Sequence, residues 1–280
     1  MTEILNGKVL AKTIHGKAKQ RVEGMEFPPG LAVILIGKNS ASRLYVKLKE
    51  TAARDVGIYV ERHAYSSKAT TEEVVEKIHE INERNDIHGI LVQLPLPKHF
   101  DTNAIIGAMN PNKDVDGFHI ENRKALIAHT PNIVPPIALS LMRLLQASHV
   151  PLKGKTAVIV GNSTIFAEPL IELLRDAGVP ATFIPKHTEG LAAITRAADI
   201  LIVAIGSAHC ITADMVKPSA VVLDVGANKL NGVTVGDVAP NVIGHAGFLS
   251  PVPGGAGPLT VEYLLFNVIK AKEIQERERE

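Results

Sequence analysis

An amine and a phenol four residues apart form the first pair of side chains in this chain whose spacing suggests chemistry. Tyr45 and Lys49 lie in residues 40–55, whose apolar periodicity predicts a helix, and a spacing of four places both side chains on one helical face. A lysine can accept a proton when burial or nearby donors lower its proton affinity. Such a pair is also common on solvated surfaces. The apolar run 31–36 and the small-residue turn 37–41 favour a functional role, because they place the start of the helix at the carboxyl end of a strand, where open α/β sheets bind ligands.

Two further polar residues are predicted at the same edge of the sheet. Gln93 lies near the end of the apolar run 89–94 (GILVQL), where a buried amide requires a hydrogen-bond partner. Asp116 lies in the turn-rich loop 113–118 (KDVDGF). Asp114 and Asp116 are also consistent with structural turn residues, since aspartate side chains often bond to the backbone of their own turn. The Tyr45–Lys49 pair, Gln93 and Asp116 still indicate a cleft, because all are predicted at strand or loop ends of one sheet.

The elements that must position these groups alternate between strands and helices. In the first half the predicted strands are residues 31–36, 58–65 and 89–94, and the predicted helices are residues 40–55 and 71–84. After Pro151 the predicted strands are residues 156–160, 181–185, 200–205 and 221–225, with helices at 165–177 and from Pro258 onward. This order predicts an α/β fold with mainly parallel sheets, and the proline-containing stretch 129–136 is the best candidate for a crossing between two domains.

The turn Gly161-Asn162-Ser163 follows a predicted strand and precedes a predicted helix. A doubly wound domain binds the pyrophosphate of a dinucleotide at such a turn, because glycine lets the backbone approach and the helix N-terminus supplies N–H donors. Only Gly161 of the usual G-x-G-x-x-G pattern is present, so an ordinary βα turn explains the segment equally well on its own. Lys186 follows the next strand, where NAD-binding domains usually carry Asp or Glu. This predicts a preference for NADP, the alternative being a solvated loop lysine.

The glycine-rich segment 250–260 (SPVPGGAGPLT) is a more specific feature of the second half. Its prolines and glycines predict a stiff, irregular loop without bulky side chains, which can bring backbone groups close to a flat ligand. Pro258 then lies near the start of the final predicted helix. A purely structural loop of this composition is the less favoured alternative.

The composition excludes several classes of function. The formal net charge is +1, aromatic residues make up 4% and tryptophan is absent, so neither nucleic acid nor an anionic membrane is an expected partner. Cys210 is the single cysteine, which excludes an intrachain disulfide and suits a reducing compartment; a buried or loop thiol is favoured over a nucleophile. The sequence shows neither a signal-peptide pattern nor an apolar run long enough to span a bilayer. No metal site is expected, because no cysteine cluster or HExxH spacing occurs.

Taken together, the motifs resemble those of the bifunctional methylenetetrahydrofolate dehydrogenase/methenyltetrahydrofolate cyclohydrolase family. The matching segments are, in order, PGLAVILIGKNSASRLYVKLK, GILVQLPLP, KDVDGF, DVGAN and PVPGGAGPLT, and the similarity covers nearly the whole chain. The resemblance implies oxidation of 5,10-methylenetetrahydrofolate with NADP, NAD being the alternative, and hydrolysis of the methenyl product to 10-formyltetrahydrofolate. It also implies a homodimer. The expected location is the cytoplasm, because a single cysteine suits a reducing compartment. The implied domains are a folate-binding catalytic domain (1–134 and 258–280), to which the C-terminal helix returns, and a Rossmann-like NAD(P)-binding domain (135–257).

The resemblance also assigns roles residue by residue. Lys49 takes the role of the main catalytic group, Gln93 bonds to it, and Tyr45 stacks near the folate. Asp116 holds the pterin ring. The remaining folate contacts fall on residues beside Gln93 and in the glycine-rich loop: Val92, Leu94, Pro251, Val252, Pro253, Gly254 and Gly255. The implied cofactor contacts are Gly161, Asn162, Ser163, Lys186, Thr188 and Ala227.

Departures from the family pattern are concentrated in the cofactor half. Asn162 replaces an arginine that helps to bind the 2′-phosphate, Ala167 replaces a glycine of the helix start, and Lys186 replaces a cysteine. Three hypotheses follow: a bifunctional enzyme, a divergent enzyme with one activity or an altered cofactor choice, and a folate-binding protein with little catalysis. The four intact polar groups of the first half favour the first hypothesis over the third.

Overall fold

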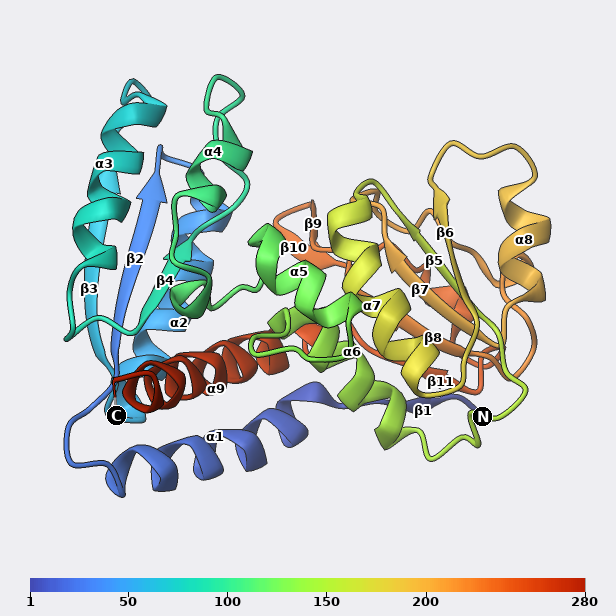
Figure 1. Cartoon of the computed structure of the whole chain (residues 1–280). Coiled ribbons are helices and arrows are strands. Elements are labelled where there is room, and N and C mark those ends of the chain that lie inside the picture. Colours follow the sequence, from blue (N-terminus) through green and yellow to red (C-terminus); the bar gives the residue numbers. More distant parts are fainter. Residues whose placement is uncertain (280) are drawn as a thin grey trace. The chain divides into compact units, whose positions relative to one another are not determined.

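The structure, a computed structural model, describes residues 1–279 and divides into two compact units (Figure 1). The three-stranded unit comprises Lys12–Pro136 and the residues from Val261 onward; the six-stranded unit comprises Met1–Ala11 and Ile137–Thr260. Both contain a parallel sheet with helical connections, which confirms the predicted fold class. None of the helices within residues 1–279 combines the length and apolar character that crossing a bilayer requires.

The sheet of the three-stranded unit has the order β3-β2-β4. β2 (Gly30–Ile36) lies in the middle and pairs in parallel with β3 (Tyr59–Tyr65) and β4 (Gly89–Val92). Every residue of β2 is buried, as expected for a parallel strand covered on both faces. Its odd-numbered apolar side chains join one core cluster and its even-numbered ones join another, because successive side chains of a strand point to opposite faces.

Two crossover helices connect these strands. α2 (Ser40–Asp55) begins after Asn39, whose side chain accepts a hydrogen bond from the backbone N–H of Ser42. α3 (Thr71–Asn82) begins with a capping box formed by Thr70 and Glu73. The other helical segments of this unit are α4 (Thr102–Gly107), η1 (Pro111–Lys113), α5 (Ile120–Ile127) and most of α1 (Gly7–Glu23) and α9 (Ala256–Arg277).

The C-terminal helix α9 supplies part of the core of the three-stranded unit. Leu264, Leu265 and Val268 are fully buried and join the cluster that contains the odd-numbered residues of β2. This confirms the expected return of the C-terminal helix to the first domain.

The sheet of the six-stranded unit is parallel and has the order β1-β11-β8-β7-β5-β6. Its strands are β1 (Glu3–Ile4), β5 (Ala157–Gly161), β6 (Ala181–Pro185), β7 (Ile200–Ala204), β8 (Val221–Asp224) and β11 (Phe248–Leu249). The chain passes from β5 to β6 on one side and then to β7 on the other side of β5, so the strand order reverses at β5. Open α/β sheets bind ligands at such a switch point, outside the carboxyl ends of the strands.

The remaining elements of this unit cover the sheet or extend from it. The helical segments are α6 (Pro136–Ala147), α7 (Thr164–Asp176), α8 (Leu191–Ala197), η2 (Ala213–Met215) and η3 (Pro240–Val242). β9 (Asn228–Leu230) and β10 (Val233–Val235) form a separate antiparallel hairpin.

The first residues of the chain group differently from the expected domain boundaries. Residues 1–11 were expected in the folate-binding domain, whereas β1 pairs with β11 and so belongs with the six-stranded sheet. The pair is anchored further by Thr2, whose hydroxyl donates to the carbonyl of Ala246 at 2.6 Å.

His15 links three helices within the three-stranded unit. Its Nδ1 lies 2.9 Å from a Glu262 carboxylate oxygen on α9, and its Nε2 lies 2.7 Å from a carboxylate oxygen of Asp55 at the end of α2. Burial alone would lower the pKa of His15, but the hydrogen bonds and charges of Asp55 and Glu262 outweigh it, and the pKa is raised above its ordinary value of 6.5. The protonated ring therefore stabilises the packing of α1 against α2 and α9.

The stability that His15 contributes is expected to depend on pH. Because the folded state holds the proton more tightly than the unfolded state, the contribution is complete below the ordinary pKa of 6.5 and is lost as the pH rises through the folded-state pKa. The free energy of unfolding of His15→Gln should therefore fall further below that of the native chain at about pH 6 than at about pH 9. Denaturant titrations at both pH values measure this difference; an equal difference at both would show that His15 is not charged in the folded chain.

Candidate active site

Helix α2 places Lys49 at the border between its buried face and solvent. Val46 and Ala53 on the same helix are fully buried, and they fix the orientation of α2 against the sheet. Lys49 retains 8% of its surface exposed, and Tyr45, one turn earlier, retains 38%. Of the two residues on this predicted helical face, Lys49 is therefore buried and Tyr45 is exposed.

Gln93 is the hydrogen-bond partner of Lys49. The Lys49 amine donates to Oε1 of Gln93 at 3.3 Å. The Gln93 amide group donates in turn to the backbone carbonyl of Leu94 at 2.7 Å, so its oxygen is directed towards the amine. The backbone N–H of Gln93 donates to Ile34 of the central strand, which fixes the position of the residue just after β4. The structure therefore brings together the predicted amine and the predicted amide.

The two aspartates of the KDVDGF loop have different roles. Asp114 is fully buried and accepts hydrogen bonds from the backbone N–H groups of Gly117 at 3.0 Å and His119 at 2.7 Å, and from the Asn122 amide at 3.1 Å. Burial raises its pKa to about 6, although these donors oppose the shift. Asp114 is thus the structural residue of the turn.

Asp116 is available for a ligand. Its half-buried carboxylate accepts no hydrogen bond from any residue of the range 1–279. Burial raises the pKa of Asp116, and the nearby charge of Lys49 acts in the opposite direction. A partly buried carboxylate that accepts no hydrogen bond from the described residues can accept hydrogen bonds from a ligand that binds beside the Lys49 amine.

The residues on either side of Gln93 pack in the core of the three-stranded unit. Val92 ends β4, is buried and packs in the core cluster that α3 covers, and Leu94 is partly buried against the same cluster. The Leu94–Pro95 peptide bond is cis.

At the switch point of the six-stranded unit, the predicted dinucleotide turn follows β5. A Cβ added at Gly161 would lie 3.2 Å from the carbonyl oxygen of Ala204, so the position has little room for a side chain. Ser163 precedes the first residue of α7, is exposed and makes no side-chain cap hydrogen bond. The Asn162 amide donates to the carbonyl oxygen of Ile205. The turn therefore leaves the start of α7 open to an anion, as a pyrophosphate site requires.

The other predicted cofactor residues lie on neighbouring loops of the same edge. Lys186 follows β6, and its backbone N–H donates to the Gly161 carbonyl at 3.2 Å. The Thr188 hydroxyl donates to the carbonyl of Pro185 at 2.8 Å, which closes the turn after β6. Ala227 is exposed in the loop after β8. The structure thus brings the predicted cofactor residues to the carboxyl edge of one sheet.

The glycine-rich loop lies in the six-stranded unit, between β11 and α9. A Cβ added at Gly255 would lie 2.7 Å from the Pro251 carbonyl oxygen, and one at Gly7 would lie 1.9 Å from the carbonyl oxygen of Gly255. The backbone N–H of Lys8 donates to the Gly254 carbonyl at 3.2 Å. Residues 251–255, which include the cis Val252–Pro253 bond, are therefore packed tightly against the first turn of α1.

Both halves of the chain match family models. Residues 5–116 match the catalytic domain of tetrahydrofolate dehydrogenase/cyclohydrolase, and residues 135–276 match its NAD(P)-binding domain. The chain belongs to the tetrahydrofolate dehydrogenase/cyclohydrolase family. This confirms the resemblance inferred from the motifs.

Individual members of the tetrahydrofolate dehydrogenase/cyclohydrolase family are similar over the whole length. The bifunctional protein FolD of Burkholderia orbicola is 42% identical over 275 residues, which cover 96% of each chain. Among solved structures, the bifunctional enzyme FolD of Campylobacter jejuni is 37% identical with a TM-score of 0.94, covering 98% of this chain and 100% of the other. The Trypanosoma brucei enzyme, solved with NADP and an inhibitor, is 32% identical with a TM-score of 0.93, covering 99% of each chain.

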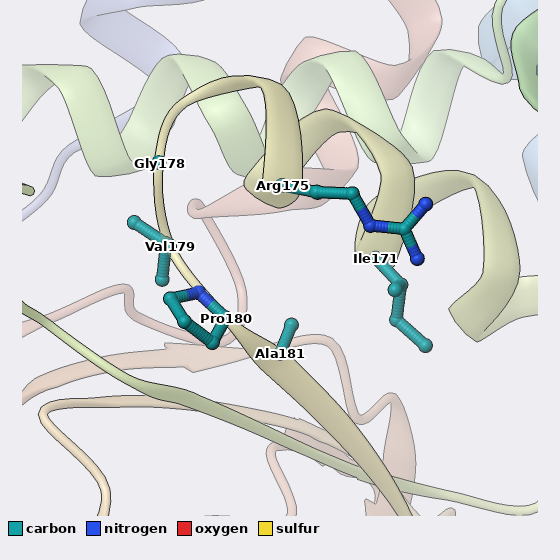
Figure 2. A pocket seen from close by; sticks show the side chains of 6 residues that line it. All are labelled: Ile171, Arg175, Gly178, Val179, Pro180 and Ala181. Carbon is teal, nitrogen blue, oxygen red and sulfur yellow. The ribbon is translucent and has the colours of Figure 1, made fainter.

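A surface hollow in the six-stranded unit lies away from the predicted cofactor residues of this family member. Figure 2 shows the hollow, whose volume is about 430 Å³, beside the end of α7 and the segment that leads into β6. Its lining residues are Ile171, Arg175, Gly178, Val179, Pro180 and Ala181. Ala181 pairs with Ala157 at the amino ends of their strands, whereas Gly161 lies at the carboxyl end of β5. The hollow is therefore at the opposite edge of the sheet from the dinucleotide turn.

Cys210 packs as an apolar residue. It lies beside the core cluster of the six-stranded unit, and burial raises the pKa of its thiol to about 11. A thiol of this kind is a poor nucleophile at neutral pH.

Two residues of the cofactor edge were missed by the sequence analysis. Asp224 and Asp237 are buried carboxylates that bind loop backbone beside the predicted cofactor residues. The available signal was a charged residue within an apolar run, VVLDV and VGDVA, which requires a buried partner.

Proposed function

We propose that this chain oxidises 5,10-methylenetetrahydrofolate to 5,10-methenyltetrahydrofolate with NADP and hydrolyses the product to 10-formyltetrahydrofolate. The observation that carries the proposal is the arrangement of three groups within one unit: the Lys49 amine, the Gln93 amide that bonds to it and the Asp116 carboxylate, which accepts no hydrogen bond within residues 1–279. Family membership and the resemblance of the motifs support it. The roles of the individual residues are part of the same proposal.

The folate would be held in part by side chains that form no hydrogen bond within the described residues 1–279. The Asp116 carboxylate accepts hydrogen bonds from the N–H groups of the pterin ring, and the exposed ring of Tyr45 offers a flat apolar surface for stacking. Val92 and Leu94, which flank Gln93 in the same unit, complete these contacts. The resemblance of the motifs assigns further folate contacts to the loop 251–255. These interactions orient the one-carbon unit towards the Lys49 amine.

Lys49 moves protons in the hydrolytic step. Water attacks the methenyl carbon, and a proton must leave the attacking water while the ring nitrogen that departs gains one. The Lys49 amine is largely enclosed and is oriented by Gln93, which accepts its hydrogen bond without adding a charge. An enclosed and oriented amine is suited to such proton transfers.

The residues at the switch point fit a dinucleotide. Gly161 has no side chain that would keep a pyrophosphate away from the backbone. No side-chain cap bonds to the N–H groups at the start of α7, so they can donate to the pyrophosphate. Gly161, Asn162, Ser163, Lys186, Thr188 and Ala227 would hold NADP, which accepts a hydride from the substrate when bound. The six-stranded unit would then be the cofactor domain, and the three-stranded unit would be the catalytic domain.

Both activities are tested by separate assays on the purified chain. One assay supplies methylenetetrahydrofolate with NADP or NAD, and the other supplies methenyltetrahydrofolate alone. We expect turnover in both, with NADP preferred in the first. Turnover in one assay only would support the divergent single-activity enzyme, and failure of both would support the folate-binding protein.

Lys186 is expected to set the preference for NADP. Lys186 is the one cation among the predicted cofactor residues, and the Asn162 amide is already bonded to Ile205. Lys186 also follows β6, where such domains discriminate at the ribose 2′ position. Lys186→Asp should raise the KM for NADP roughly tenfold to a hundredfold and leave the KM for NAD within a few-fold, since a charge-assisted contact with the 2′-phosphate is lost. Lys153→Asp, at the amino edge of the sheet, is the matched control. Unchanged selectivity in Lys186→Asp would assign the 2′-phosphate to other groups.

A homodimer is part of the same proposal. The hairpin of β9 and β10 projects two apolar side chains, Leu230 and Val233, which pair with each other and are 43% and 62% exposed. Exposed apolar side chains on a small hairpin support a role in association. Light scattering should give about twice the chain mass of 30.0 kDa.

The proposed location is the cytoplasm. A single, partly buried cysteine is compatible with a reducing compartment. Fractionation of cells that produce the chain tests this location.

A further inference from the structure

Two buried carboxylates lie at the carboxyl edge of the six-stranded sheet and are not among the residues to which the proposed function gives a role. Asp224 is the last residue of β8, and Asp237 follows β10. Their exposed fractions are 3% and 0%. A buried charge is costly unless it is fully hydrogen-bonded, so the partners of these two residues indicate what they do.

Asp237 collects four donors from two loops. Its Oδ2 accepts from the backbone N–H groups of Ile205 at 2.6 Å and Gly206 at 2.9 Å, and its Oδ1 accepts from the backbone N–H of Ser207 at 2.8 Å. The Asn228 amide also donates to Oδ1 at 2.8 Å. Three successive N–H groups that converge on one anion define the path of the loop after β7.

Asp224 holds the segment that carries Asp237. Its Oδ1 accepts from the backbone N–H groups of Gly226 at 2.8 Å and Asp237 at 3.1 Å, and its Oδ2 accepts from Val238 at 2.9 Å. Burial raises the pKa of Asp224 to about 6, although these backbone donors oppose the shift.

Glycines permit the close approach of the two carboxylates to the loops. A Cβ added at Gly226 would lie 2.4 Å from Cγ of Asp237, and one at Gly236 would lie 1.8 Å from Oδ2 of Asp224. Each carboxylate therefore occupies the space that a side chain on the opposite loop would fill. No other residue type fits these two positions without displacement of the loops.

The loops held in this way are those that carry the predicted cofactor residues. Ala227 lies between Gly226 and Asn228, and both neighbours bond to one of the two carboxylates. The carbonyl oxygen of Ile205 accepts the hydrogen bond of Asn162, which connects the dinucleotide turn to the loop bound by Asp237. Asp237 thus connects the loops that follow β7 and β8 directly, and the loop that follows β5 through Ile205.

We propose that Asp237 is a positioning residue for the dinucleotide: it shapes residues 205–207 and 226–228 so that they present their outer faces to the cofactor. The proposal rests on the proposed function, because it assumes that NADP binds at this edge. Asp237 acts through the loops and does not itself contact the cofactor.

The test compares NADP binding with cyclohydrolase activity in the full-length chain. Asp237→Asn keeps the size of the side chain but replaces one acceptor oxygen by a donor that faces N–H groups. Calorimetric titration with NADP should give a Kd at least about tenfold weaker than that of the native chain, because hydrogen bonds to a charged group are lost. The rate of methenyltetrahydrofolate hydrolysis should stay within about twofold, since Lys49, Gln93 and Asp116 all lie in the three-stranded unit.

Asp199→Asn is the matched control. Asp199 immediately precedes β7, at the amino edge of the sheet, and binds Lys217 at 2.8 Å and the backbone N–H of Thr156 at 3.1 Å. Its replacement removes hydrogen bonds at the amino end of β7, whereas Asp237 binds the loop after the carboxyl end of this strand. The melting temperature should therefore fall, while the Kd for NADP stays within about twofold. Asn228→Ala, which removes one of the four donors to Asp237, should weaken NADP binding by a smaller factor and serves if Asp237→Asn does not fold.

The outcomes separate this proposal from the proposed function. An Asp237→Asn or Asn228→Ala chain that binds NADP as tightly as the native chain would overturn the positioning role and leave the proposed function intact. An equal loss of NADP binding and hydrolysis in Asp237→Asn would indicate a general structural role and would also overturn it. If the native chain binds no NADP, the dehydrogenase half of the proposed function fails and this inference fails with it.

Discussion

Replacing Lys49 with methionine is expected to abolish the hydrolysis of methenyltetrahydrofolate while folate still binds. Methionine preserves most of the apolar length of a side chain that is 8% exposed, so the packing of α2 should persist. It removes the amine that Gln93 orients. Loss of a positioned proton-transfer group typically lowers a rate by roughly 10²–10⁴-fold, and a loss of this size should appear in kcat. Absorbance of the methenyl compound measures the reaction, and fluorescence titration measures binding.

Lys47→Met provides the control for this experiment. Lys47 is exposed on the same helix and has no ion pair or hydrogen bond among the interactions of residues 1–279, so its replacement should leave kcat unchanged. Undiminished hydrolysis in Lys49→Met would remove Lys49 from its catalytic role. Loss of folate binding together with hydrolysis would instead make Lys49 a binding residue.

The main strands and helices were predictable because burial imposes a clear periodicity on them. α2 and β6 have the predicted bounds, and β2 begins one residue before the predicted run, at Gly30. β1 and β11 were not predicted, since each has only two residues and they pair across more than two hundred positions of the chain. Such a pair leaves no local pattern. The register of distant short strands is fixed by the folded sheet and not by the neighbouring sequence.

The candidate site was predictable to the level of residue type but not of hydrogen bonding. Spacing suggested Tyr45 and Lys49, and a polar residue in an apolar run suggested Gln93. The sequence could not distinguish Asp114 from Asp116, because both lie in one turn and either could bond to its backbone. The structure distinguishes them by their partners: Asp114 accepts three hydrogen bonds from its own loop and the following helix, and Asp116 accepts none within residues 1–279.

The unusual asparagine of the dinucleotide turn illustrates a further limit of sequence comparison. Asn162 stands where the family pattern has a phosphate-binding arginine, which suggested a weakened site. In the folded chain its amide bonds to Ile205 and so connects the turn to the loop that Asp237 shapes. A substitution that removes one contact with the ligand can thus add one within the scaffold, and only the folded structure shows this exchange.

Replacing Asp116 with asparagine or alanine is expected to impair both reactions through binding. The carboxylate has no protein donor within residues 1–279 and is proposed to accept hydrogen bonds from the pterin, which both substrates carry. Two charge-assisted hydrogen bonds lost from the folate correspond to a rise of roughly 10²-fold in the KM for methylenetetrahydrofolate and for methenyltetrahydrofolate. The Kd for NADP, measured by calorimetry, should not change. Asp86→Asn, an exposed aspartate of the same unit that pairs with Arg84, is the matched control.

The same variant should separate binding from stability. Burial raises the pKa of Asp116, although Lys49 acts in the opposite direction, so at neutral pH the ionised carboxylate is less favourable in the folded chain than in the unfolded chain. Asp116→Asn removes this cost, and its melting temperature at pH 7 should equal or exceed that of the native chain. A lower melting temperature would show that Asp116 supports the fold, and an unchanged KM for both folates would remove it from the binding site. A variant that melts no earlier but binds folate a hundred times less well would show that the carboxylate is kept in place for its ligand at the expense of stability.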